Sequence, residues 1–214
     1  MPALFRLGIV LCFTAASMAQ GRPPQTKKAK KPPKTHTVVL GKWSMVRLEQ
    51  KKGPDKRVRV RPLLVDDRLK EYAAGLTHDV TDQMFVVRRA YRINDSLPQE
   101  AAKLAHWKWH LGPWISVNRQ TGHVAELKLP AFDVDSSEAT WFQDYVAYCG
   151  MSDDRGKNFM VIFRLGKRKP LLQADVGNQY CGPPAWQRNP VRAIFTPFGG
   201  EAVSFRVEES GEEP

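Results

Sequence analysis

The chain has 214 residues, of which 42% are hydrophobic, and it carries a formal net charge of +11. Six tryptophans and ten phenylalanines supply enough apolar surface for a packed core, which excludes disorder along the whole chain. The length that remains after an N-terminal leader fits one domain of ordinary size better than two.

The first residues have the pattern of a secretory signal peptide. Arg6 precedes a short apolar run, and Ser17 and Ala19 place small side chains at the positions that a signal peptidase reads. The apolar run is too short to cross a bilayer, which needs about 20 residues, and no later stretch is as apolar. We therefore predict a signal peptide at residues 1–19 and export of the remaining chain to a periplasmic, envelope-associated or secreted location.

Residues 20–37 form a basic, proline-rich segment that contains no acidic residue. Its cations are Arg22, Lys27, Lys28, Lys30, Lys31 and Lys34. Because they account for much of the net charge, residues 38–214 are only mildly basic. This composition predicts a solvated linker, which either binds an anionic polymer or membrane surface or acts as a spacer without a partner.

Strand signals begin directly after the linker. Apolar and polar side chains alternate, or short apolar runs occur, at residues 38–40, 43–48, 58–61 and 84–87. Turn residues separate these segments, among them the pair Asp66-Asp67. The pattern predicts antiparallel strands joined by short turns.

One helix signal interrupts the strands. Ser96 is a capping residue, Pro98 stands at the start of the helix, and Glu100 places an acid in the first turn. Strong helix formers continue to Ala105, so we expect one short helix near residues 97–105.

Three further pairs of strand-like segments follow along the chain. The pairs are 114–117 with 124–129, 141–150 with 159–164, and 193–195 with 202–207. Polar or glycine-containing turns separate the members of each pair, which is typical of antiparallel hairpins.

The segments 114–129 and 140–172 resemble the blade meanders of β-propellers, in which an aromatic residue precedes a strand, a polar turn and a return strand. The preceding half of the chain has no matching period. We therefore expect an all-β fold of mainly antiparallel sheets, barrel-like, sandwich-like or partly propeller-like. A single domain at residues 38–207 would end in the acidic tail 208–214.

Two cysteines, Cys149 and Cys181, remain after removal of the predicted signal peptide. In an oxidising compartment two thiols are expected to pair, although two buried free thiols are the alternative. A bridge would close a loop of about 33 residues and stabilise the fold by ~3–4 kcal/mol.

Familiar catalytic and cofactor motifs are missing from the sequence. It contains no H-E-x-x-H, no glycine-rich phosphate loop, no G-x-S-x-G and no C-x-x-C. His106 and His110 have no adjacent third zinc ligand, and the acidic stretch 133–138 has Glu138 where a calcium loop needs glycine. We therefore expect no metal, no cofactor and no catalytic residue, which favours a binding protein over an enzyme.

The aromatic cluster Trp107, Trp109 and Trp114 is the most suggestive feature. Such side chains either stack on sugar rings, or on bases beside a cation, or fill a core. Specific nucleic-acid binding is not expected, because the excess charge lies in the linker and the protein is predicted to be exported. We expect a non-enzymatic binding or scaffolding domain at the cell envelope. The alternative is a small polysaccharide-active enzyme or a sugar-binding module.

Overall fold

The computed structural model describes residues 34–48, 56–96, 105–151, 156–177 and 179–207. Several predicted segments lie outside them: the signal peptide, residues 20–33 of the linker, residues 97–104 of the helix and the acidic tail 208–214. These segments stay predictions.

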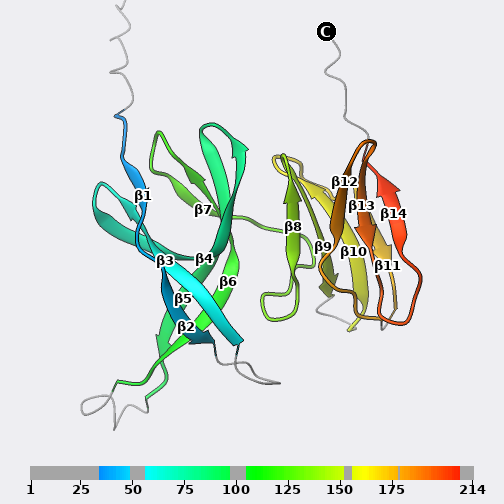
Figure 1. Cartoon of the computed structure of the whole chain (residues 1–214), viewed down its shortest axis with the longest axis horizontal. Coiled ribbons are helices and arrows are strands. Elements are labelled where there is room, and N and C mark those ends of the chain that lie inside the picture. The colour runs from blue at the N-terminus through cyan, green and yellow to red at the C-terminus, as the bar shows by residue number, and fades with distance from the viewer. Residues whose placement is uncertain (1–33, 49–55, 97–104, 152–155, 178, 208–214) are drawn as a thin grey trace, which may run out of the picture. The chain divides into compact units, whose positions relative to one another are not determined.

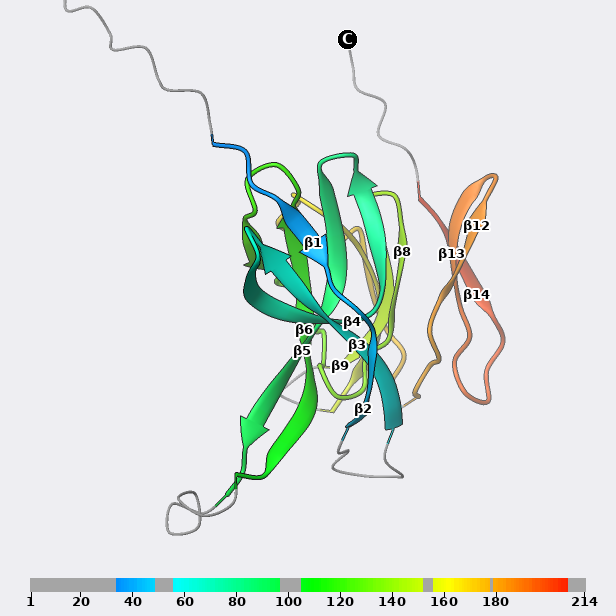
Figure 2. The same cartoon turned by 60° about the vertical axis from the view of Figure 1, so that its left-hand side comes forward.

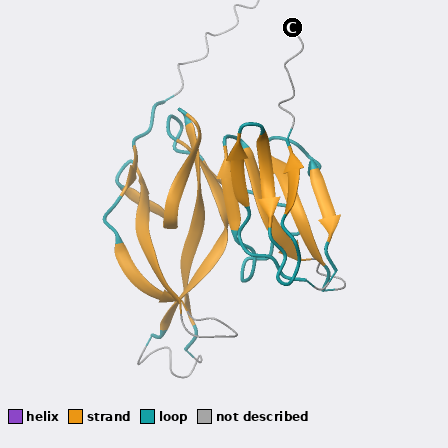
Figure 3. Ribbon diagram, turned by 45° about the vertical axis from the view of Figure 1, so that its right-hand side comes forward, coloured by secondary structure: helices purple, strands orange, loops and turns teal. Residues whose placement is uncertain are grey.

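Every regular element among the described residues is a β-strand, and no helix occurs there (Figure 3). Nearly all strand pairs are antiparallel. The predicted all-β fold is therefore confirmed.

The first sheet contains seven strands from the first half of the chain (Figure 1). They are β1 (Val38–Leu40), β2 (Ser44–Leu48), β3 (Lys56–Val65), β4 (Arg68–Thr81), β5 (Met84–Asn94), β6 (Trp107–Asn118) and β7 (Val124–Glu126). Strand β1 pairs with β3 at one edge, and β7 pairs with β6.

Five of these strands close into a barrel-like ring. Strands β2 to β6 each pair with the next, and β2 also pairs with β6 through Leu48 and Trp109. This last pairing is parallel. Five strands that run alternately up and down begin and end in the same direction, so the closing pair must be parallel.

The core of the first sheet lies on both of its faces. Ala73 and Ala74 are neighbours on β4 and therefore point to opposite faces. Ala73 packs in a cluster with Leu63, whereas Ala74 packs in a second cluster with Val60. Strand β6 contributes to both clusters because its pairing with β5 shifts register between Arg88 and Ala90 of β5.

Two smaller sheets follow in the chain. A four-stranded sheet contains β8 (Ala139–Phe142), β9 (Tyr145–Met151), β10 (Asn158–Arg164) and β11 (Leu172–Asp175). A three-stranded sheet contains β12 (Ala185–Arg188), β13 (Val191–Phe195) and β14 (Val203–Arg206). Met160 of β10 and Phe195 of β13 share one buried cluster, so the two sheets pack as a sandwich.

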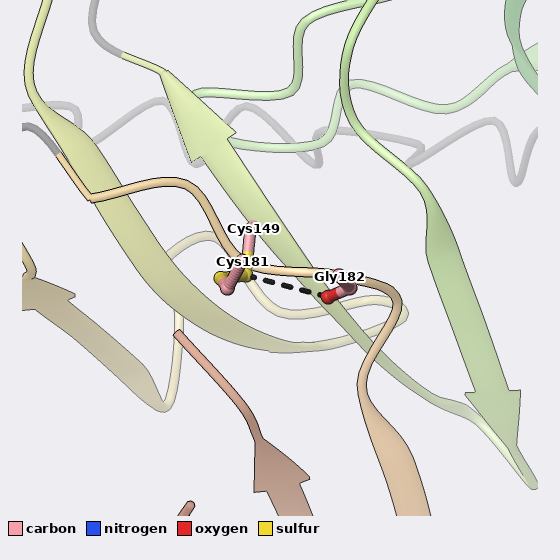
Figure 4. Close-up of a disulfide and its surroundings, with 3 residues drawn as sticks. All are labelled: Cys149, Cys181 and Gly182. Atoms are coloured by element: carbon pink, nitrogen blue, oxygen red, sulfur yellow. Dashed lines mark hydrogen bonds between the residues drawn. A yellow bond between two sulfur atoms is a disulfide. The ribbon is translucent and has the colours of Figure 1, made fainter. Parts of the chain in front are cut away.

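A disulfide joins these two sheets (Figure 4). Cys149 lies on β9, and Cys181 lies in the segment that precedes β12, with a Cα–Cα distance of 6.0 Å. Cys149 Sγ also lies 3.8 Å from the carbonyl oxygen of Gly182. The predicted Cys149–Cys181 bridge is present.

The segments that resemble propeller blades are distributed over two sheets. Residues 139–175 form a four-stranded antiparallel meander, as in a blade. Residues 114–126 instead pair within the first sheet. The segment 141–150, expected as one strand, is divided by a tight turn at Gln143, which has a φ of 51°.

Candidate functional site

The structure separates the three tryptophans that the sequence grouped. All three lie on β6. Trp107 is 56% exposed, and both Trp107 and Trp109 lie beside Arg92. Trp114 instead packs edge-on against Trp141, with ring centroids 5.2 Å apart. Trp107 and Trp109 therefore share one neighbourhood, and Trp114 belongs to another.

Of the six linker cations, only Lys34 falls within the described residues. Its segment, 34–37, is held between two turns. The Asp66 backbone N–H donates to Thr37 O at 2.9 Å, and the His36 backbone N–H donates to Gln120 O at 2.8 Å. The root of the linker is thereby fixed against the β3–β4 turn and the β6–β7 turn.

Gly122 permits this close approach. Its φ is +64°, a left-handed conformation that favours glycine. A Cβ atom there would lie 2.5 Å from Val65 Cγ1 and 3.1 Å from His36 Cβ. The segment 34–37, the β3–β4 turn and the β6–β7 turn can approach one another here because Gly122 has no side chain.

These segments enclose an open cleft of about 700 Å³, which we call the cationic cleft. It is lined by Lys34, His36, Val65, Asp66, Arg68, Lys70, Thr121, Gly122 and His123. Arg68 and Lys70 stand two apart at the start of β4.

Positive charge predominates in the cationic cleft. Lys34, Arg68 and Lys70 are exposed, and none of them forms an ion pair with a carboxylate that the structure describes. Asp66 is the one carboxylate in the lining. It accepts hydrogen bonds from the Thr37 backbone N–H at 3.0 Å and from His36 Nδ1 at 2.7 Å.

These contacts keep Asp66 ionised. The Thr37 N–H, followed by the His36 hydrogen bond, holds the pKa of Asp66 below its ordinary value. The ionised carboxylate offsets one of the three cations in the lining, and an excess of positive charge remains for an external anion.

A second, smaller cavity of about 270 Å³ shares one lining residue with the cationic cleft. We call it the aromatic pocket, and it is lined by Leu69, Lys70, Glu71, Tyr72, Ala90, Tyr91, Arg92 and Trp107. Lys70 lines both cavities. The pocket lies along the paired ends of β5 and β6, which Figure 2 shows extending from the rest of the sheet.

Arg92 is the charged centre of the aromatic pocket. Its Cζ lies 5.8, 5.5 and 5.4 Å from the ring centroids of Tyr72, Trp107 and Trp109. Each distance is within the range of a cation–π interaction. The neighbouring carboxylate of Glu71 bonds Arg89 Nε at 2.8 Å, and Arg92 pairs with no carboxylate in the described part of the chain.

A further basic strip lies on β3. Arg57, Arg59 and Arg61 alternate along this strand. The Cζ atoms of Arg59 and Arg61 lie 5.4 and 4.2 Å from the centroid of Trp43. Partial burial lowers the pKa of Arg61.

The weak metal candidates have ordinary structural contacts. Asp133 Oδ1 accepts bonds from the backbone N–H groups of Asp135 and Ser136, which makes a polar turn. His110 stacks on Tyr91 with ring centroids 5.7 Å apart. In the described ranges, no group of three His, Cys, Asp or Glu side chains is arranged to hold a metal ion.

No protein-family model matches this chain, and no curated protein or solved structure shows significant similarity to it. Among the residues with described positions, no helix is long and apolar enough to cross a membrane.

Proposed function

We propose that this protein is an exported, non-enzymatic binding domain that holds an anionic polymer at the cell envelope. The cationic cleft carries this proposal. Lys34, Arg68 and Lys70 surround an open cavity whose single lining carboxylate is already hydrogen-bonded. Three exposed cations repel one another, and an anionic ligand relieves that repulsion.

The linker extends this surface along the chain. Its cations Arg22, Lys27, Lys28, Lys30 and Lys31 precede Lys34, which lines the cleft. A long polyanion can contact the linker and the cleft together, whereas a small anion reaches only one of them. Simultaneous contacts on one chain raise the apparent affinity through effective concentration.

The described residues give less support to an enzyme. Glu71, the carboxylate of the aromatic pocket, pairs with Arg89, and Asp66 of the cleft bonds His36 and Thr37. His36 and His123 also line the cleft, so the preference for a binding protein rests on the excess of positive charge there and not on a lack of titratable groups.

Matched charge removal tests the proposal. The probe is fluorescent dextran sulfate, titrated against the chain without its predicted signal peptide. The double variant Arg68→Ser with Lys70→Ser is expected to weaken binding roughly tenfold or more, and to lower the salt dependence by about one to two released ions.

The control variant is Lys167→Ser with Arg168→Ser, which removes two exposed cations from the β10–β11 turn. It loses the same charge away from the cleft and is expected to bind almost normally. Equal loss of affinity in both double variants would mean that net charge alone drives binding, and the cleft would not be a site.

A further inference from the structure

The aromatic pocket has features that charge attraction alone does not require. Trp107 is 56% exposed although it is the largest side chain of the pocket. An indole face open to water is available to stack on the apolar face of a sugar ring. Trp109 differs, because it is half-buried and packs edge-on against Tyr72 with ring centroids 5.0 Å apart.

Arg92 lies beside this open ring and is itself exposed. Its guanidinium also lies within 6 Å of the ring centroids of Tyr72 and Trp109. An exposed guanidinium is accessible to a ligand, and its planar fork matches a carboxylate in a bidentate manner.

The dimensions of the pocket suit a single sugar ring. Its volume is about 270 Å³, and Trp107 is the most exposed of the rings around Arg92. Tyr72 and Tyr91 add phenol hydroxyls to the lining, which can donate or accept hydrogen bonds with sugar hydroxyls.

The pocket and the cationic cleft share one lining residue, Lys70. A linear ligand with one ring at Trp107 can therefore place its next charge beside Lys70. A polyphosphate or an anionic lipid surface has charge but no ring to stack on Trp107. A polymer of acidic sugars provides a ring and a carboxylate in every unit.

We propose that the aromatic pocket is a binding subsite for a uronic acid residue, and that the polymer held by the cationic cleft is an acidic polysaccharide. The sugar ring stacks on Trp107, and its carboxylate bonds Arg92. This inference rests on the proposed function and names the ligand class of the same surface.

The test compares three probes on the chain without its predicted signal peptide: polygalacturonate, inorganic polyphosphate and single-stranded DNA. Trp107→Ala is expected to weaken polygalacturonate binding roughly tenfold, the usual effect of losing one stacked ring. Arg92→Lys keeps the charge but removes the fork, and it is expected to weaken the same probe by a factor of about five to ten. Polyphosphate binding should change less than twofold in both variants.

Trp43→Ala is the matched control, because Trp43 is also partly exposed and also lies beside arginines, in this case Arg59 and Arg61 of β3. It should leave polygalacturonate binding unchanged. The uronate inference fails if Trp107→Ala and Arg92→Lys affect polygalacturonate no more than polyphosphate, or if their largest effect is on DNA. The proposed function fails separately, if no polyanion depends on Arg68 and Lys70.

Discussion

Asp66 links the stability of the cleft to pH. Its carboxylate accepts bonds from the Thr37 N–H and His36, and these lower its pKa in the folded state. Asp95, bonded by Lys108, and Asp175, bonded by the Gly177 N–H, also have lowered pKa values. A lowered folded-state pKa stabilises the fold above the unfolded pKa, and this stabilisation is lost as pH falls through the folded value.

We therefore expect the free energy of unfolding to decrease as the pH falls below about 4. Asp66→Asn removes one of the three carboxylates and should flatten this decrease. Urea denaturation at a series of acidic pH values measures the effect. An unchanged dependence in Asp66→Asn would show that the Thr37 and His36 contacts do not act on this carboxylate.

Substitution of Gly122 tests whether the backbone geometry of the cleft contributes to the stability of the fold. Gly122→Ala adds the strain of a left-handed residue and a contact with Val65, and we expect a loss of about 2–4 kcal/mol in stability. Gly166→Ala is the matched control, because Gly166 has a φ of +80° and no atom within 4 Å of a Cβ there. It should cost only about 1–2 kcal/mol.

Thermal and urea unfolding of the two glycine variants give this comparison directly. Dextran sulfate binding then provides a second readout, since Gly122→Ala should also displace His36 and the cleft lining. If both substitutions cost the same and binding is unaffected, the close approach at Gly122 has no role.

At the scale of elements, the alternating strands and most hairpins are predictable from the sequence. The irregular positions that interrupt the alternation within strands are not predictable. The full length of β4 escapes prediction because Gly75, with a φ of +70°, and a shift in register after Ala74 break its period. The early start of β6 escapes prediction because Gly112 and Pro113 stand inside it. The β8–β9 turn could not be predicted because it contains no glycine: Gln143 itself adopts the positive φ.

The candidate site is predictable only in part. Trp107 stands out by its residue type, and the alternation of Arg68 and Lys70 after the Asp66-Asp67 turn is visible in the sequence. Arg92 cannot be joined to them from sequence, because its place beside Tyr72 depends on the pairing of β4 with β5. That pairing includes shifts of register, which alternation alone does not reveal.

The disulfide should stabilise the β8–β14 region. Because it closes a long loop, replacing both Cys149 and Cys181 by alanine is expected to lower the free energy of unfolding by about 3–4 kcal/mol. Urea unfolding of this variant, and of the wild-type chain with and without a reductant, provides the measurement. Equal midpoints for all of these samples would show that the bridge contributes nothing.

At the scale of the whole molecule, charge is distributed unevenly along the chain. The linker carries six cations, the cleft adds Arg68 and Lys70, and the last residues 208–214 are mainly acidic. A polyanion bound by the linker alone would make no contact with the folded domain. A polyanion bound by the cationic cleft and the linker together requires each of them to contribute separately to the affinity.

The most direct test of this requirement is the salt dependence of dextran sulfate binding by two chains, one starting at Gln20 and one starting at Pro33, which keeps Lys34 and His36 of the cleft lining. We predict that the shorter chain binds more weakly and releases fewer ions, but still binds, and that Arg68→Ser with Lys70→Ser removes most of the remaining affinity. If the chain starting at Pro33 does not bind at all, or if the double variant leaves its affinity unchanged, the cationic cleft is not the binding site.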